Sequence, residues 1–128
     1  MIISAQSFLI PLVKYPHLLT PIDRKSGSII EVEYNKPLFV SEGGLADHDD
    51  SDRAEYITRQ VEGVRRAIAD GADVRGHLYW SLMDNYEWAL GTAKQFGLIK
   101  INYDTLEREI RPSAWVYKEL IEKYSKVQ

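Results

Sequence analysis

The segment GHLYWSLMDNYEW, residues 76–88, decides how the fold is interpreted, because its character changes midway. Its first half, His77–Trp80, is aromatic and apolar, which is typical of a buried strand. Its second half turns polar at Ser81 and Asp84, as a loop leaving a strand does. A strand that runs into an aromatic loop bearing carboxylates is how a barrel forms the rim of its active site.

The same segment has the composition of a sugar-binding surface. The rings of Trp80 and Trp88 offer flat apolar faces to the C–H side of a pyranose, and Glu87 can accept hydrogen bonds from neighbouring hydroxyls. Taken alone, the two tryptophans are more often core residues, because large aromatic side chains are mostly buried. The residue types alone therefore leave both interpretations open.

Length and charge restrict the class of protein. The 128 residues suffice for one domain but fall short of the roughly 250 that a complete (β/α)8 barrel needs. Lys and Arg total 16 against 19 Asp and Glu, a net charge of −3 with no basic stripe. We therefore expect neither nucleic acid nor an anionic membrane as a partner.

Other composition features concern metals and location. The absence of cysteine excludes disulfides and thiolate metal sites and fits a cytoplasmic protein. The three histidines are too far apart in the sequence for a local metal site, so no metal or cofactor is predicted. The apolar start, Met1–Val13, lacks a basic beginning and a cleavage pattern, which predicts neither a signal peptide nor a membrane span.

Residues 1–36 are predicted to be an irregular N-terminal segment, and the boundary with the rest of the chain is placed near residue 36. Three prolines at five-residue intervals prevent a long helix: Pro11, Pro16 and Pro21. Within this segment, Ile2–Val13 is interpreted as one extended or irregular apolar stretch, and Ser28–Glu33 as a possible short strand.

Residues 37–41 form a short apolar run that predicts a buried strand, and Glu42 follows it directly. Gly43 and Gly44 then let the backbone turn sharply, so the strand would present a carboxylate at its carboxyl end. The alternative is an ordinary strand-to-loop turn with a solvated glutamate.

A helix over residues 53–69 is predicted from apolar residues spaced by four, three and four positions: Ile57, Val61, Val64 and Ile68. Asp52 and Glu55 have capping-box spacing, and Asp70-Gly71 ends the pattern. The acidic loop at 47–52 is interpreted as helix-start charge, since its spacing does not match a calcium loop.

Strand, helix and strand over residues 37–80 make a βαβ unit, whose strands should be parallel and adjacent. Both strand ends should open on one edge, which would make Glu42 and Trp80 neighbours.

Residues 96–103 and 107–110 predict a hairpin. Pro112 then opens a last helix with four residues on its buried face: Val116, Leu120, Ile121 and Tyr124.

Several of these segments, in this order, resemble glycoside hydrolase family 1, and within it the archaeal β-galactosidases and β-glucosidases. Residues 39–44, FVSEGG, are similar to the nucleophile strand of that family, and residues 80–88, WSLMDNYEW, to its sugar-binding loop. Further matches are GADVRG at 71–76, FGL at 96–98 and RPSA at 111–114. The resemblance covers residues 37–124 and implies an α/β fold, with residues 37–128 forming the C-terminal portion of a TIM (β/α)8 barrel.

The resemblance also implies roles for individual residues. Glu42 would be the catalytic nucleophile of a retaining β-glycosidase acting on β-galactosides or β-glucosides. Trp80, Glu87 and Trp88 would bind the non-reducing-end sugar, and Phe96 would support that pocket. These five roles rest on the family likeness and not on spacing.

Three departures from the family pattern stand out. Gly43 takes the place of a usual asparagine, and Gln95 the place of a usual arginine before Phe96. The family's acid/base glutamate lies in an Asn-Glu-Pro motif, which this chain lacks. A retaining glycosidase needs two carboxyls about 5–5.5 Å apart, so we expect a complementing chain or self-association. The alternative is a non-catalytic sugar-binding or structural remnant of the fold.

Overall fold

The computed structural model describes residues 2–5 and 37–125. The chain forms two compact units. The first comprises residues 1–43 and 59–79, and the second comprises residues 44–58 and 80–128. Among the described residues, neither long helix has the length and apolar character that crossing a membrane would require.

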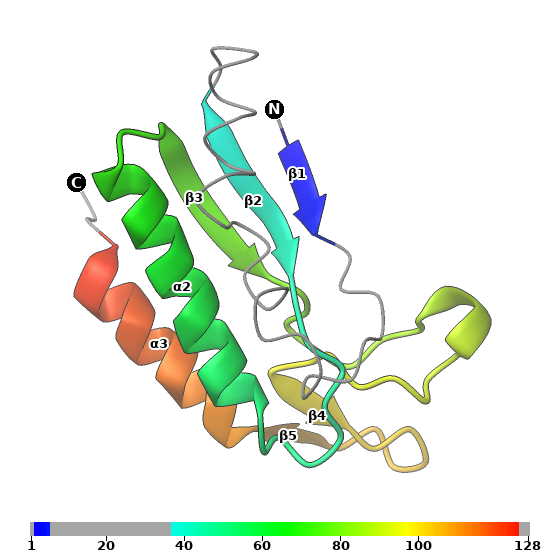
Figure 1. Cartoon of the computed structure of the whole chain (residues 1–128). Helices are drawn as coiled ribbons and strands as arrows, with labels where there is room; N and C mark the ends of the chain where they lie inside the picture. Colours follow the sequence, from blue (N-terminus) through cyan, green and yellow to red (C-terminus); the bar gives the residue numbers. More distant parts are fainter. Residues whose placement is uncertain (1, 6–36, 126–128) are drawn as a thin grey trace. The chain divides into compact units, whose positions relative to one another are not determined.

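The first unit contains a parallel sheet in the order β1-β2-β3 (Figure 1). Its strands are β1 (Ile2–Ala5), β2 (Leu38–Gly43) and β3 (Val74–Tyr79). The predicted pairing of the last two is confirmed, since β2 and β3 are adjacent and parallel. β3 ends at Tyr79, one residue before the predicted end, because the backbone bends at Trp80.

The sheet has a third strand that the sequence patterns did not predict as one. β1 pairs in parallel with β2, with Ile2 opposite Phe39 and Ala5 opposite Gly43. The chain's own N-terminal residues therefore cover one edge of β2. The rest of the predicted apolar stretch, residues 6–13, and the possible strand Ser28–Glu33 lie outside the described residues.

The helix α2 (Arg53–Ala69) has the predicted bounds. Asp47 caps the start of this helix, and not Asp52 as predicted. Oδ2 of Asp47 accepts hydrogen bonds from the backbone N–H groups of Asp52 and Arg53, each at 3.0 Å. At the other end the chain turns at Gly71, whose φ of 103° favours glycine.

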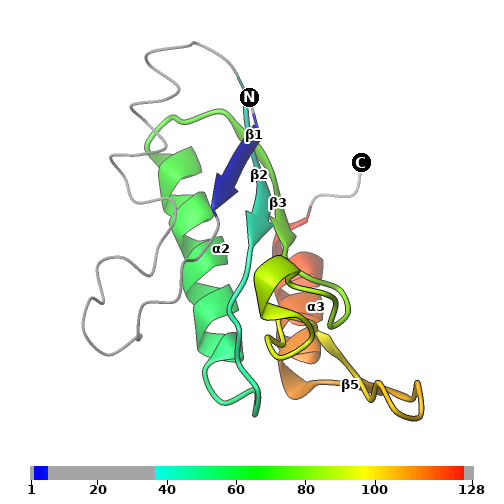
Figure 2. The same ribbon diagram turned by 90° about the vertical axis from the view of Figure 1, so that its right-hand side faces the viewer.

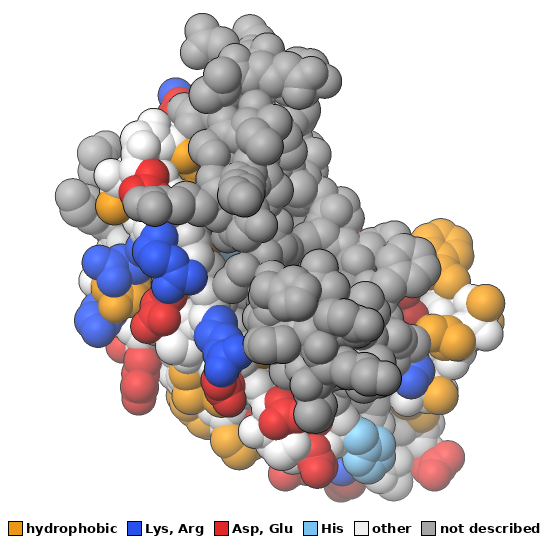
Figure 3. All heavy atoms as spheres, viewed as in Figure 1, with side chains coloured by type: hydrophobic (Ala, Val, Ile, Leu, Met, Phe, Trp, Pro, Cys, Tyr) orange, Lys and Arg blue, Asp and Glu red, His pale blue; other side chains and the backbone are white. Residues whose placement is uncertain are grey.

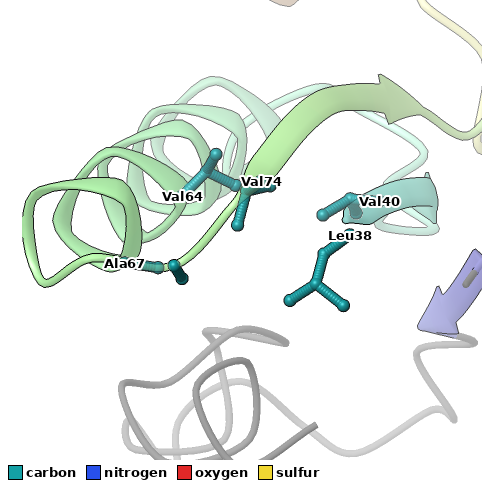
Figure 4. Packing of buried hydrophobic residues seen from close by; sticks show 6 residues of the cluster. Leu38, Val40, Val64, Ala67 and Val74 are labelled. Atoms are coloured by element: carbon teal, nitrogen blue, oxygen red, sulfur yellow. The ribbon is translucent and has the colours of Figure 1, made fainter. Parts of the chain in front are cut away.

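The core of the first unit is an apolar cluster between α2 and one face of the sheet (Figures 2 and 4). It consists of Leu38, Val40, Val64, Ala67, Ala72 and Val74. The predicted helix face is confirmed for Val64, which is 8% exposed, and for Ile57. It is wrong for Ile68, which is 48% exposed near the end of α2, where the adjacent Ala67 is the residue that packs in the cluster.

The opposite face of the sheet is partly open. Phe39 and Leu78 are 37% and 52% exposed, so the expectation of fully buried strands is wrong for these positions. Side chains alternate along a strand, and Leu38 and Val40 point to the α2 side. A Cβ on Gly76 would lie 2.1 Å from the Phe39 ring, so the missing side chain makes room for that ring.

The second unit contains a two-stranded sheet and a helix. β4 (Ile99–Ile101) and β5 (Arg108–Ile110) pair antiparallel, which confirms the predicted hairpin. The helix α3 (Pro112–Tyr124) begins at the predicted proline. Three residues of its predicted buried face are partly buried, but Ile121 is 46% exposed, so the prediction is wrong there. A short 3₁₀ helix, η2 (Trp88–Leu90), lies in the long loop before β4.

Candidate functional site

Glu42 is the second-last residue of β2, one residue before the strand ends, and it is partly buried. The register pairs Gly43 with Tyr79, the last residue of β3. Because the two strands are parallel, their carboxyl ends open on the same edge of the sheet, as the spacing predicted. That edge is where ligands of parallel α/β sheets and barrels bind.

Next to Gly43, a polar pair joins α2 to β3. Gln60 is 3% exposed, and its Oε1 lies 3.0 Å from Nε2 of His77. Burial lowers the pKa of His77 from 6.5 to about 4, so this imidazole is neutral at pH 7. A Cβ on Gly43 would lie 2.3 Å from Oε1 of Gln60, so glycine at this position is what allows the pair to pack here.

In the second unit, the predicted sugar-binding tryptophans are exposed. Trp80 is 39% and Trp88 is 80% exposed, so the alternative that they are core residues is wrong. Other large hydrophobic side chains of the same loop are also exposed: Leu82, Met83, Tyr86 and Leu90. Figure 3 shows hydrophobic side chains gathered where Figure 1 places η2. Exposed apolar surfaces of this kind occur at ligand-binding sites and at protein–protein interfaces.

Glu87 is held at the base of a tight backbone loop. Its N–H donates to the carbonyl of Gly91 at 2.7 Å, and its carbonyl accepts from the N–H of Leu90 at 2.8 Å. Gly91 has a φ of 58°, which closes the loop without a side chain. These backbone bonds fix where the partly buried Glu87 and the exposed Trp88 emerge.

Phe96 lies beside the start of the same loop. The N–H of Ser81 donates to the carbonyl of Phe96 at 3.4 Å, and the N–H of Leu98 donates to the carbonyl of Ser81 at 3.0 Å. A Cβ on Gly44 would lie 1.9 Å from the carbonyl oxygen of Trp80, so this glycine allows a close backbone approach. The peptide bond from Trp80 to Ser81 is cis.

The loop is anchored by a buried ion pair that the sequence patterns did not identify. The carboxylate of Asp84 accepts two hydrogen bonds from the guanidinium of Arg111, both at 3.0 Å, and the two side chains are 1% and 5% exposed. Asp84 also accepts from the N–H groups of Gly97 at 2.9 Å and Ile101 at 3.3 Å. Asp84 is therefore committed to holding the loop and not to a ligand.

The acidic loop at 47–52 is likewise structural. Asp50 accepts from the backbone N–H of Ser113 at 2.8 Å and from its hydroxyl at 2.7 Å, which caps α3. Asp50 also binds the guanidinium of Arg53, a fully buried side chain. No group of three or more His, Cys, Asp or Glu in the described part of the chain is placed to hold a metal ion.

The predicted site residues are therefore divided between the two units. Glu42 belongs to the first, at the carboxyl edge of its sheet. Trp80, Glu87, Trp88 and Phe96 all belong to the second, where they lie on one loop that is anchored by Asp84 and Arg111. No sequence signal separated these two charged residues from solvated ones, apart from the position of Arg111 just before the helix-opening proline.

Similar solved structures define the class. The β-glucosidase of Pyrococcus furiosus aligns with 78% of this chain and 21% of its own, at a TM-score of 0.76 and 39% identity. The β-glycosidase of Thermosphaera aggregans aligns with 79% of this chain and 21% of its own, at a TM-score of 0.73 and 38% identity. The fold is the C-terminal portion of a TIM (β/α)8 barrel of the β-glycosidase class.

Sequence comparisons give the family. The Glycosyl hydrolase family 1 model matches residues 16–126, so the chain belongs to glycosyl hydrolase family 1. A β-galactosidase of Saccharolobus solfataricus is 51% identical over 87 residues, which are 68% of this chain and 18% of that protein. β-Glucosidase A of Acetivibrio thermocellus is 39% identical over 103 residues, 73% of this chain and 23% of that protein. The chain thus spans about a fifth of these relatives.

Proposed function

We propose that this chain is the nucleophile-bearing part of a retaining β-glycosidase that hydrolyses β-galactosides or β-glucosides by double displacement. The observation that carries the proposal is the place of Glu42 at the carboxyl end of β2, where the register brings the ends of β2 and β3 to one edge. Its support beyond geometry is membership of a family whose relatives are named β-galactosidase and β-glucosidase.

In the proposed reaction, a carboxylate oxygen of Glu42 forms a bond to the anomeric carbon while the bond from that carbon to the leaving oxygen breaks. The leaving oxygen keeps the electron pair and takes a proton from a general acid. Water then attacks the glycosyl ester, gives up a proton to the same group acting as base, and releases the sugar with Glu42 restored. The anomeric configuration is retained because it is inverted twice.

The sugar would be held by the loop of the second unit. The exposed rings of Trp80 and Trp88 suit the apolar face of a pyranose, and the carboxylate of Glu87 suits its hydroxyls. Phe96, whose backbone is bonded to the start of the loop, would support them. Glucose and galactose differ in the configuration of one hydroxyl, and a carboxylate has two acceptor oxygens that can serve either configuration.

The general acid would come from a complementing chain. No Asn-Glu-Pro motif occurs in these 128 residues, and the chain spans about a fifth of its relatives. Without general acid catalysis a rate falls by about 10²–10⁴-fold, so this chain alone should turn over ordinary glycosides poorly. The exposed Phe39 and Leu78 on one sheet face offer apolar surface to such a chain or to a second copy.

The missing motif also favours a second candidate, a non-catalytic remnant that keeps the sugar-binding loop or only the fold. Light scattering and mass determination of the species purified from its native context separate the two. If this chain is part of an enzyme, it should co-purify with a second chain that carries the general acid. A stable homo-oligomer that binds sugar without turnover would favour the remnant.

The nucleophile role is tested by turnover of an aryl β-glycoside in that purified assembly. Glu42→Gln should abolish turnover while leaving folding intact, because the neutral amide does not form the glycosyl ester. Glu62→Gln is the matched control, since Glu62 is an exposed residue of α2 and its loss should leave turnover unchanged. Full activity of Glu42→Gln would refute the role.

A further inference from the structure

Gln95 lies where three separate segments of the second unit meet. Its backbone carbonyl accepts from the N–H of Asp47 at 3.0 Å and from Nη2 of Arg53 at 2.8 Å. Its side-chain Oε1 accepts from Nη2 of Arg111 at 2.8 Å. Gln95 therefore connects the acidic loop, the residue before α3 and the sugar-binding loop, and it directly precedes Phe96.

The side chain of Gln95 completes the hydrogen bonding of Arg111. Nη1 donates to Asp84 Oδ1 at 3.0 Å and to the carbonyl of Gly97 at 2.6 Å. Nη2 donates to Asp84 Oδ2 at 3.0 Å and to Gln95 Oε1. Each of these nitrogens carries two hydrogens, so all four have an acceptor. Because the guanidinium is buried, losing one acceptor removes a bond that water does not readily replace.

We propose that Gln95 is a positioning residue for the sugar-binding loop, residues 80–98, which it acts on through Arg111 and Asp84. The amide oxygen of Gln95 accepts the fourth of the hydrogen bonds donated by the two Nη groups of Arg111. In this way it holds the plane of the Arg111 guanidinium parallel to the carboxylate of Asp84. Asp84 in turn fixes the amides of Gly97 and Ile101. The role in sugar binding rests on the proposed function, and the role in loop order does not.

The test compares Gln95→Met, which keeps the length but lacks the acceptor, with Gln95→Glu, which keeps an acceptor oxygen. Amide hydrogen exchange at Gly97 and Ile101 reports the loop directly. Gln95→Met should exchange about tenfold faster than wild type at both amides, and Gln95→Glu should match wild type. Gln95→Ala provides the same comparison if the methionine does not fit.

Affinity for a phenyl β-thioglucoside, measured by calorimetry, reports the sugar-binding role. Gln95→Met should weaken binding about tenfold, with Gln95→Glu again close to wild type. Ser113→Ala is the matched control, since it removes a partly buried hydrogen bond to Asp50 in the same unit. It should lower stability while leaving loop exchange and thioglucoside affinity unchanged.

Two results would overturn the positioning role. One is wild-type exchange at Gly97 and Ile101 in Gln95→Met. The other is an equal effect of Gln95→Met and Ser113→Ala on exchange and affinity, which would show a general contribution to stability. If wild type binds no thioglucoside, the proposed sugar site fails, and the exchange comparison still decides whether Gln95 orders the loop.

Discussion

The two units are stabilised by different kinds of interaction. The first has an apolar cluster of strand and helix side chains, while the loop of the second is fixed by a buried ion pair and its hydrogen bonds. Apolar packing tolerates small changes of shape, but a buried charge without its partner is strongly unfavourable. The second unit, which contains the loop of residues 80–98, should therefore be the more sensitive to single polar substitutions.

The largest effect on stability is expected for Arg111→Met. The carboxylate of Asp84 would stay buried without its guanidinium, which costs about 3–5 kcal/mol in the free energy of unfolding, measured with urea. Lys118→Ala, which removes an exposed ion pair to Glu122, should change little. Similar losses for the two variants would contradict the idea that a buried charge pair holds this unit.

In the first unit, Leu38→Ala should lower the free energy of unfolding by about 2–5 kcal/mol, because Leu38 is 1% exposed and its removal leaves a cavity. Leu38→Met should lower it by less than about 1.5 kcal/mol, since the volume is nearly kept. The same urea measurement serves both. If Leu38→Met were as damaging as Leu38→Ala, shape and not apolar burial would control this core.

A further prediction concerns the first unit, whose stability should depend on pH through His77. Its folded pKa of about 4 lies below the ordinary 6.5, so the unfolded chain binds more protons between these values. Stability should fall as pH drops from about 6.5 to 4, by up to roughly 3 kcal/mol from this group. His77→Gln should remove that part of the dependence. Identical curves for variant and wild type would show that His77 is not titrating in this way.

A smaller and more selective effect is expected for Glu87→Ala. Loss of a charged acceptor should weaken the binding of glucose- and galactose-configured ligands by about 1.5–3 kcal/mol. It should weaken the binding of a deoxy ligand, which lacks the bound hydroxyls, by less. Calorimetry with the matched ligands measures the difference. An equal loss for every ligand would indicate that the loop has lost its order.

The fold of the first unit was predictable because apolar patterning determines it. Between residues 38 and 79 the two strands are short apolar runs and the helix follows a period of 3.6, and the parallel pairing of the strands follows from the helix between them. The prediction was wrong at Ile68 and, in the second unit, at Ile121, which are 48% and 46% exposed although Ala67 is buried and Tyr124 is partly buried. Periodicity identifies the apolar face of a helix, but which residues of that face are buried depends on the elements that pack against it.

The anchoring of the second unit was not predictable in the same way. Asp84, Arg53 and Arg111 have no pattern that separates them from solvated charges, and their partners are up to 42 residues away in the sequence. The roles of the five candidate site residues came from a family resemblance, although residue types alone had already pointed to Trp80, Glu87 and Trp88. The structure places four of the five on one loop. Spacing alone indicated that Glu42 ends a strand and that the carboxyl ends of the two neighbouring strands share one edge.

The central claim, that Glu42 is a nucleophile, is tested most directly by trapping its glycosyl ester. A dinitrophenyl β-glucoside with fluorine beside the anomeric carbon has a leaving group that needs no proton, so the missing general acid is bypassed, and the fluorine slows hydrolysis of the ester. Intact-mass measurement followed by peptide mapping should find one fluoroglucosyl group on Glu42 in wild type and none in Glu42→Gln. A label on another carboxylate, or an equal label in Glu42→Gln, would contradict the account.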